Sequence, residues 1–256
     1  MTGMTRARHP ALRQAGRLLA LVLLCLLSMQ LVFVGRIALM AVVDPQSTTF
    51  QRSEAWRLLS QQQRILWSQQ WVDSAALSAN LKRAVIASED AGFVEHPGVD
   101  WDALERAWEK NQRVQARADR AGLVGTPRPG ARAPKVVGGS TITQQLAKNL
   151  LLSGERTVSR KAQEMLLTVM LETLLSKQRI LEIYLNNVEW GEGIFGAQAA
   201  ARHYFRVDAA RLSPEQAARL AVMLPAPKRF EKNPASPYVL GRAATIVARM
   251  GDVVLP

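Results

Sequence analysis

Residues 160–186 read RKAQEMLLTVMLETLLSKQRILEIYLN, and this stretch decides the fold class. It contains neither Gly nor Pro, it is rich in Leu, Met and Glu, and its apolar residues recur at intervals of three and four. That spacing puts the apolar residues on one face of an α-helix, and these residue types favour helix. We expect one long helix, or two helices that meet near Ser176.

A second helical signal stands at Ser213-Pro214-Glu215-Gln216. Ser213 suits the N-cap, Pro214 the first helical position, and Gln216 completes a capping box. The helix should run through AARLAVML and end before Pro225. Strand signals are weak along the chain and no repeat period is present, so the sequence predicts a mainly α-helical protein.

The chain has 256 residues, enough to bury a sizeable core, and a formal net charge of +12. Residues 1–36 hold five arginines and no acid, which leaves +7 for the remainder. That remainder predicts an anionic partner, namely phosphate groups, lipid head groups or nucleic acid. The single cysteine, Cys25, excludes an intrachain disulfide framework and a Cys-based metal site.

An uncharged run of 18 residues from Leu18 to Gly35 is long enough to cross a bilayer, at about 27 Å of helix. Four arginines precede this run and only Arg36 stands directly behind it, which predicts a cytoplasmic N-terminus and an external remainder. A cleaved signal peptide is the alternative. The length of the run and the lack of a small-x-small cleavage site before Asp44 favour a retained anchor.

Phe50 to Trp71 carries three tryptophans, Trp56, Trp67 and Trp71, which would share one face of a continuous helix. Such a face suits a helix on the outer leaflet of a membrane, or packing on the core of the domain. Between about residues 109 and 139, seven Lys or Arg oppose two acids, and Gly, Pro and Ala are abundant from 121 to 134. We expect that segment to be basic and mobile.

Three polar clusters are candidates for chemistry. In GGSTITQQLAKNL, residues 138–150, Thr141 and Gln144 form a predicted capping box, and two glycines allow close approach of a ligand. Backbone N–H groups, an amide from Gln144 or Gln145, and the ammonium of Lys148 could then converge on an anion. An ordinary cap with a solvated lysine is the simpler alternative.

The second cluster is Arg160, Lys161 and Glu164, which present two cations and one carboxylate to one side of a helix, or form a surface ion pair of little energy. The third is the acidic segment ASEDAGFVEHPGVD, residues 87–100, in which crowded carboxylates around Phe93 could raise a pKa. With three histidines in the chain, His-based metal binding is improbable, and an Asp/Glu site for a hard cation stays open.

Five motifs in order resemble glycosyltransferase family 51 of bacterial cell-wall synthesis, over about residues 80–235. They are ASEDAGFVEHPGVD (87–100), GGSTITQQLAKNL (138–150), RKAQEMLLTVMLE (160–172), KQRILEIYLNNVEWGEGIFGAQAAARHYF (177–205) and LAVMLPAPKRFEKNP (220–234). The resemblance implies a lysozyme-like, two-lobed helical glycosyltransferase domain. Because no Ser-x-x-Lys is present and the chain stops soon after the fifth motif, we expect a monofunctional member without transpeptidase activity.

The resemblance also assigns roles. It makes Glu89 the general base that deprotonates the 4-hydroxyl of lipid II, with the glycan chain on undecaprenyl pyrophosphate as donor and a β-1,4 link as product. Glu164 becomes the second essential carboxylate, with an orienting or stabilising part. The implied substrate contacts are Ser140, Thr141, Gln145, Lys148, Asn149, Arg160 and Lys161, while Asp90, Phe93 and His96 shape the site. The fourth motif, with Tyr184 and Asn186, is expected to be scaffold.

These assignments predict four regions: a cytoplasmic tail (1–17), a transmembrane anchor (18–43), a membrane-proximal amphipathic segment (44–75) and the glycosyltransferase domain (76–250). The expected location is the bacterial inner membrane, single-pass, with the catalytic domain on the periplasmic face. Expected partners are lipid II, the growing glycan strand and membrane lipid, with division or elongation proteins open and nucleic acid excluded. No metal or cofactor is required; a divalent cation such as Mg²⁺ at the pyrophosphate stays open.

Two other classes of protein are alternatives to a glycosyltransferase. A lytic enzyme of similar fold also uses two carboxylates across a cleft, but it has no pyrophosphate to bind, so a basic cleft would not serve it. A non-enzymatic, membrane-anchored scaffold would use its positive charge to bind anionic lipid. Loss of polymerisation on replacing Glu89 by Gln would separate enzyme from scaffold.

Overall fold

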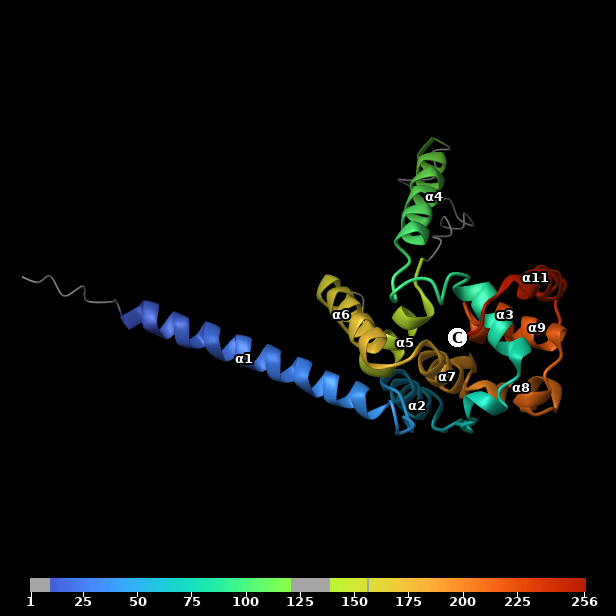
Figure 1. Cartoon of the computed structure of the whole chain (residues 1–256), viewed down its shortest axis with the longest axis horizontal. Helices are drawn as coiled ribbons and strands as arrows, with labels where there is room; N and C mark the ends of the chain where they lie inside the picture. Colours follow the sequence, from blue (N-terminus) through green and yellow to red (C-terminus); the bar gives the residue numbers. More distant parts are fainter. Residues whose placement is uncertain (1–9, 121–138, 156) are drawn as a thin grey trace, which may run out of the picture.

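The computed structural model describes residues 10–120, 139–155 and 157–256 (Figure 1). Its regular structure is mainly α-helical, as predicted, and the sheet within these ranges is a short antiparallel hairpin of β1 (Glu189–Gly191) and β2 (Ile194–Phe195). The helices are α1 (Pro10–Leu39), α2 (Thr49–Gln62), α3 (Ala79–Glu89), α4 (Trp101–Arg120), α5 (Ile142–Leu151), α6 (Val158–Leu174), α7 (Lys177–Asn187), α8 (Ala197–Phe205), α9 (Pro214–Met223), α10 (Pro227–Phe230) and α11 (Pro237–Arg249).

The stretch 160–186 forms two helices that meet near Ser176, the second of the two predicted outcomes. Ser176 caps α7, because its hydroxyl accepts a hydrogen bond from the backbone N–H of Arg179. The predicted capping boxes at the start of α5 and α9 are both present. Helix α9 ends at Met223, before Pro225, as the sequence predicts.

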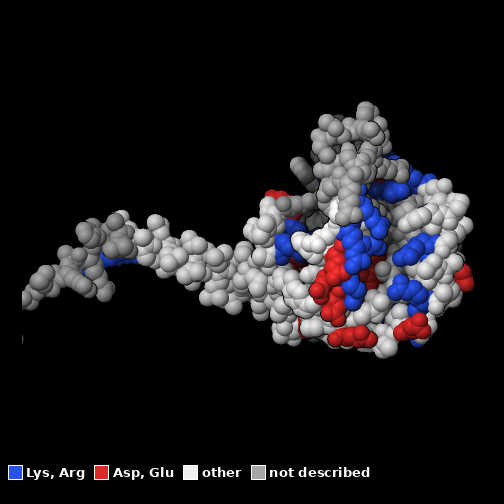
Figure 2. Space-filling model, turned by 90° about the horizontal axis from the view of Figure 1, so that it is seen from above, with Lys and Arg blue, Asp and Glu red and all other residues white. Residues whose placement is uncertain are grey.

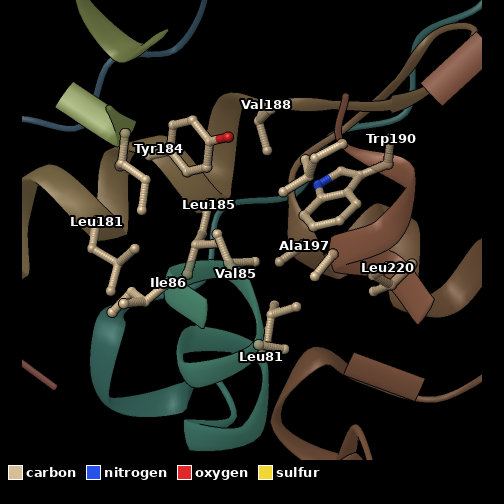
Figure 3. Close-up of a cluster of buried hydrophobic side chains, with 14 of the residues drawn as sticks. Leu81, Val85, Ile86, Leu181, Tyr184, Leu185, Val188, Trp190, Ala197 and Leu220 are labelled. Atoms are coloured by element: carbon tan, nitrogen blue, oxygen red, sulfur yellow. The ribbon is translucent and has the colours of Figure 1, made fainter. Parts of the chain in front are cut away.

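The core lies between two groups of helices. Helices α3, α9 and α11 pack together on one side, and α5 packs on α2, α6 and α7 on the other (Figure 1). Apolar side chains of α3, such as Leu81 and Val85, meet Leu185 of α7 and the fully buried indole of Trp190 (Figure 3). This packing fixes α3, whose last residue is Glu89.

Helix α1 extends away from the body as a rod (Figure 1). Its segment Arg13–Leu39 is apolar and long enough to cross a membrane, and none of the most apolar window is buried against the protein. The C-terminal half of α1 is attached to the domain. Gln30 and Gln163 of α6 exchange two amide hydrogen bonds of 2.9 and 3.0 Å, and Ile37 is fully buried.

The expected continuous helix from Phe50 to Trp71 is wrong. Helix α2 ends at Gln62, because Gln63 takes a left-handed backbone conformation with φ of 52°. Trp56 therefore stands exposed on α2, whereas Trp67 lies beyond the helix with its ring 5.1 Å from that of Phe195. Trp71 packs against the core, so the three tryptophans share no helical face.

The basic segment predicted to be mobile divides in two. Its first part, residues 109–120, belongs to the amphipathic helix α4, which projects from the body (Figure 1). This part is helical because residues 109–120 lack Gly and Pro and continue a helix that begins at Trp101, whereas its mobility stays a prediction. Residues 121–138, where Gly and Pro gather, lie outside the described residues.

Gly196 offers a test of the packing between α7 and α8. It has φ of +79°, and a Cβ there would lie 2.5 Å from the backbone oxygen of Asn186. Gly196→Ala should lower the free energy of unfolding by about 2–4 kcal/mol. Gly241→Ala is the matched control, because Gly241 lies in an exposed helix with nothing within 4 Å of the new Cβ. This variant should raise the free energy of unfolding by about 0.5–1 kcal/mol. Chemical denaturation measures both, and equal effects would contradict the crowding at Gly196.

Candidate active site

Asp90 joins the acidic segment to the start of α5. Its Oδ2 accepts a hydrogen bond of 2.9 Å from the backbone N–H of Ile142, and its Oδ1 lies 2.8 Å from Nε2 of His96. Because Nδ1 of His96 accepts the N–H of Gly98 at 3.1 Å, the imidazole proton belongs on Nε2 and points to Asp90. One carboxylate therefore holds the end of α3, the following turn and the first residue of α5 together.

The same turn is held from the core side. Phe93 is fully buried, and Nζ of Lys177 lies 4.5 Å from the centre of its ring. That ammonium also donates to the backbone oxygen of His96 at 2.8 Å, and the hydroxyl of Thr141 donates to the oxygen of Gly98 at 2.6 Å. Phe93 and His96 thus have structural contacts that account for their positions.

Glu89 lines a cavity of about 870 Å³ at the C-terminal end of α3. Gln145 donates its side-chain N–H to Oε2 of Glu89 at 3.0 Å. Gln145 is itself oriented by the hydroxyl of Tyr184, which donates to Oε1 of Gln145 at 3.0 Å. Burial of Glu89 raises the pKa of its carboxyl, and the charge of Asp90 adds to this; the hydrogen bond from Gln145 acts in the opposite direction. The carboxyl is thereby poised to take a proton closer to neutral pH.

Charges of both signs line this first cavity. The acids are Glu89, Asp90, Glu95, Asp100 and Asp102, and the cations are Arg106, Lys110 and Arg249. In the view from above, acidic side chains gather beside a row of basic ones (Figure 2). The sequence analysis missed these three cations; Lys110 lies in the segment expected to be mobile, whereas Arg106 and Arg249 lie outside all five motifs.

A second cavity of about 530 Å³ contains the other predicted carboxylate, Glu164. Glu164 is only 3% exposed and is paired with both predicted cations: Nη1 of Arg160 lies 2.8 Å from Oε2, and Nζ of Lys161 contacts Oε1. The lining also includes four more of the predicted substrate contacts, Ser140, Gln145, Lys148 and Asn149. Of the two alternatives for this cluster, the surface ion pair is wrong, because Glu164 is a buried carboxylate held between two cations.

The two cavities adjoin. Ser140 lines both of them, and Gln145, from the lining of the second, donates to Glu89 in the first. Thr141, the N-cap of α5, lines the first cavity. The two cavities therefore meet at Ser140, just ahead of α5.

Two acids in the second cavity were not predicted, Glu54 of α2 and Glu189 of β1. Glu189 is 7% exposed, and burial raises the pKa of its carboxyl to about 7; the negative charges of Glu54 and Glu231 reinforce the shift, while Lys228 opposes it. The sequence gives little signal here, because a three-residue strand shows no periodicity. Within the described ranges, no cluster of three or more His, Cys, Asp or Glu is arranged to hold a metal ion.

Comparisons with known proteins agree with this geometry. A sequence model of the family described as "Transglycosylase" matches residues 57–251. A protein of Burkholderia thailandensis named "Biosynthetic peptidoglycan transglycosylase" is 51% identical over 230 residues, 90% of this chain and 83% of the relative. A protein of the same name from Paraburkholderia phytofirmans is 46% identical over 257 residues, covering 100% of both chains.

A helical domain that sets one buried and one half-buried carboxylate beside cationic groups suits a sugar-transferring enzyme with an anionic leaving group. This defines the class. The chain belongs to the transglycosylase family, whose model matches most of its length, and its lysozyme-like helical fold is that of this family.

The raised pKa of Glu189 predicts a pH-dependent cost to stability. As pH rises from about 4.5 towards 7, the unfolded chain releases this proton before the folded protein does, so stability falls and the loss is complete above about pH 7. Glu189→Gln cannot ionise. The free energy of unfolding of Glu189→Gln minus that of the wild type should therefore increase by about 1–3 kcal/mol as pH rises from about 4 to 8.

Denaturant unfolding of the detergent-solubilised protein measures this gain. Glu192→Gln is the matched control, since Arg57 lowers the pKa of Glu192 and the variant should lose stability relative to the wild type as pH rises. A difference between Glu189→Gln and the wild type that stays constant over this range would contradict the raised pKa.

Proposed function

We propose that this protein polymerises lipid II into glycan strands of peptidoglycan. The growing chain on undecaprenyl pyrophosphate is transferred to the 4-hydroxyl of lipid II, with inversion to a β-1,4 link. The observation that carries the proposal is the pair of adjoining cavities, one with the half-buried carboxyl of Glu89 and the other with Glu164 between Arg160 and Lys161. The five motifs and the family membership support it.

In this proposal Glu89 is the general base. Its raised pKa lets it accept the proton of the attacking 4-hydroxyl, and the N–H of Gln145 fixes the direction of the carboxylate. Tyr184 is buried and the pKa of its phenol is raised well above the usual value, so it stays neutral and keeps donating to Gln145. The base is thus oriented by a chain of two hydrogen bonds that begins in the core.

The leaving diphosphate is assigned to the second cavity. Arg160 and Lys161, with Lys148 one helix away, supply the positive charge that stabilises a departing pyrophosphate, so no general acid is needed. Glu164 keeps the two cations in place, since it contacts both from a buried position. A lytic enzyme would have no such anion to stabilise, and these cations weigh against the lytic alternative.

The membrane supplies the setting for this reaction. Helix α1 is apolar and of spanning length, which suits a single-pass anchor. We assign it to the bacterial inner membrane, with the N-terminal arginines in the cytoplasm and the catalytic domain on the periplasmic face. Lipid II, the growing strand and membrane lipid are then the partners, and a divalent cation such as Mg²⁺ would act only at the pyrophosphate.

The proposed function is tested on purified lipid II. The wild type should make long glycan chains on gels, Glu89→Gln should lower the rate at least about 100-fold, and Glu164→Gln at least about tenfold, because Arg160 and Lys161 lose their partner. Glu109→Gln, in an exposed pair with Arg113, is the control and should behave as the wild type. Polymerisation by Glu89→Gln at the wild-type rate would refute the base assignment.

The hydrogen bond from Gln145 predicts a change in the pH profile. It lowers the pKa of Glu89, so its removal in Gln145→Leu should raise that pKa further. Because the base acts when deprotonated, the acidic limb of the polymerisation rate should move to higher pH. Tyr184→Phe, which removes a contact with Gln145 but none with Glu89, should move the limb less. A limb that moves to lower pH in Gln145→Leu would exclude this role.

A further inference from the structure

Glu189 is a buried acid whose one ion pair among the described residues, with Lys228, is long. It lies in the wall of the second cavity at 7% exposure, and within the described part of the chain its Oε1 has no hydrogen-bond partner. Nζ of Lys228 forms an ion pair with this oxygen at 3.5 Å and also contacts Glu54. A buried carboxylate without a donor is costly, so a contact that offsets the cost is expected from outside the chain.

The same cavity holds an unpaired donor. Nε of Arg160 is buried without a hydrogen-bond partner among the described residues, although Nη1 of this guanidinium binds Glu164. The lining thus offers an acceptor at Glu189 and a donor at Arg160. A ligand that satisfies both must carry an acceptor oxygen, such as that of a phosphate, and a hydroxyl or amide N–H within the reach of a cavity of about 530 Å³.

The rest of the lining is consistent with such a ligand. Lys148, Lys161 and Arg160 place positive charge in the cavity, while Val188, Leu224 and Pro227 supply apolar surface next to Glu189. Sugar rings present hydroxyl groups at their edges and C–H surface on their faces. A sugar joined to a phosphate therefore matches the lining better than a free phosphate does.

We propose that Glu189 is a substrate-binding residue that accepts a hydrogen bond from a hydroxyl or amide N–H of the amino sugar attached to the diphosphate. This inference deepens the proposed function and rests on it. Rotation about the last torsion of the side chain, which is soft, turns either carboxylate oxygen towards the cavity. Glu189 then sets the position of the donor sugar while Arg160 and Lys161 hold its diphosphate.

Binding of a soluble, short-chain lipid II analogue tests the inference, with inorganic pyrophosphate as the second probe. The variants are Glu189→Leu, with Glu189→Ala as a smaller replacement should Leu not fit, and Glu189→Gln, which keeps an acceptor oxygen. Loss of the acceptor should weaken binding of the analogue about tenfold and leave binding of pyrophosphate unchanged. Glu189→Gln should restore most of the affinity for the analogue.

Stability supplies a readout that separates binding from structure. If the carboxylate serves a ligand, Glu189→Leu or Glu189→Ala should unfold at the same temperature as the wild type or above it at about pH 8, since an unpaired buried charge is removed. A structural carboxylate would instead make both variants less stable. Glu192→Gln, at an acid that binds Arg57 outside the cavity, is the control for binding and should match the wild type.

Three results would overturn the inference: unchanged affinity of the Leu and Ala variants for the analogue, equal loss of affinity for analogue and pyrophosphate, or a lower unfolding temperature in both variants. Failure of the proposed function looks different. In that case the wild type itself makes no glycan from lipid II, whereas here the wild type polymerises and only the contribution of Glu189 is in question.

Discussion

Asp90 accepts hydrogen bonds from the imidazole of His96 and from the backbone N–H of Ile142, and this pair of contacts determines where the candidate site can form. Glu89 is the residue before Asp90 and Gln145 lies one turn into α5, so the contact fixes the distance between them. Each bond to the carboxylate is charge-assisted and buried, where such bonds are strong. Together with the hydrogen bond from Gln145 to Glu89, the contact between Asp90 and Ile142 links the end of α3 to the start of α5 at the point where the base must be oriented.

The carboxylates in the two cavities have different neighbours. Glu164 is buried between two cations, which compensate its loss of hydration, whereas Glu89 receives only neutral donors and its pKa rises. This separation suits two roles, because Glu164 holds two cations while Glu89 can exchange a proton. Glu189 is intermediate between Glu164 and Glu89, because Lys228 lies near its Oε1 but none of the described residues donates a hydrogen bond to that atom.

Much of the helical architecture follows from the sequence, since capping and apolar periodicity are local. The start of α5 at Thr141, the start of α9 at Ser213 and the junction at Ser176 were all predicted from side chains within a few residues. The prediction that three tryptophans share one helical face is wrong, because a single residue in the left-handed conformation, Gln63, ends α2. The place of Glu189 could not be predicted, because it depends on α2, β1 and α10 meeting around one cavity.

The paired amides of Gln30 and Gln163 fix the rotation of α1 about its own axis and its position along that axis relative to α6. In an otherwise apolar rod, sliding by one residue or turning by 100° about its axis would break both hydrogen bonds and leave two amides unpaired in a lipid environment. Helix α6, which bears Gln163, also bears Arg160, Lys161 and Glu164. The position of these charges relative to α1 is therefore fixed in part by this polar pair, together with the buried Ile37 and the bond from Arg179 to the backbone oxygen of Met40.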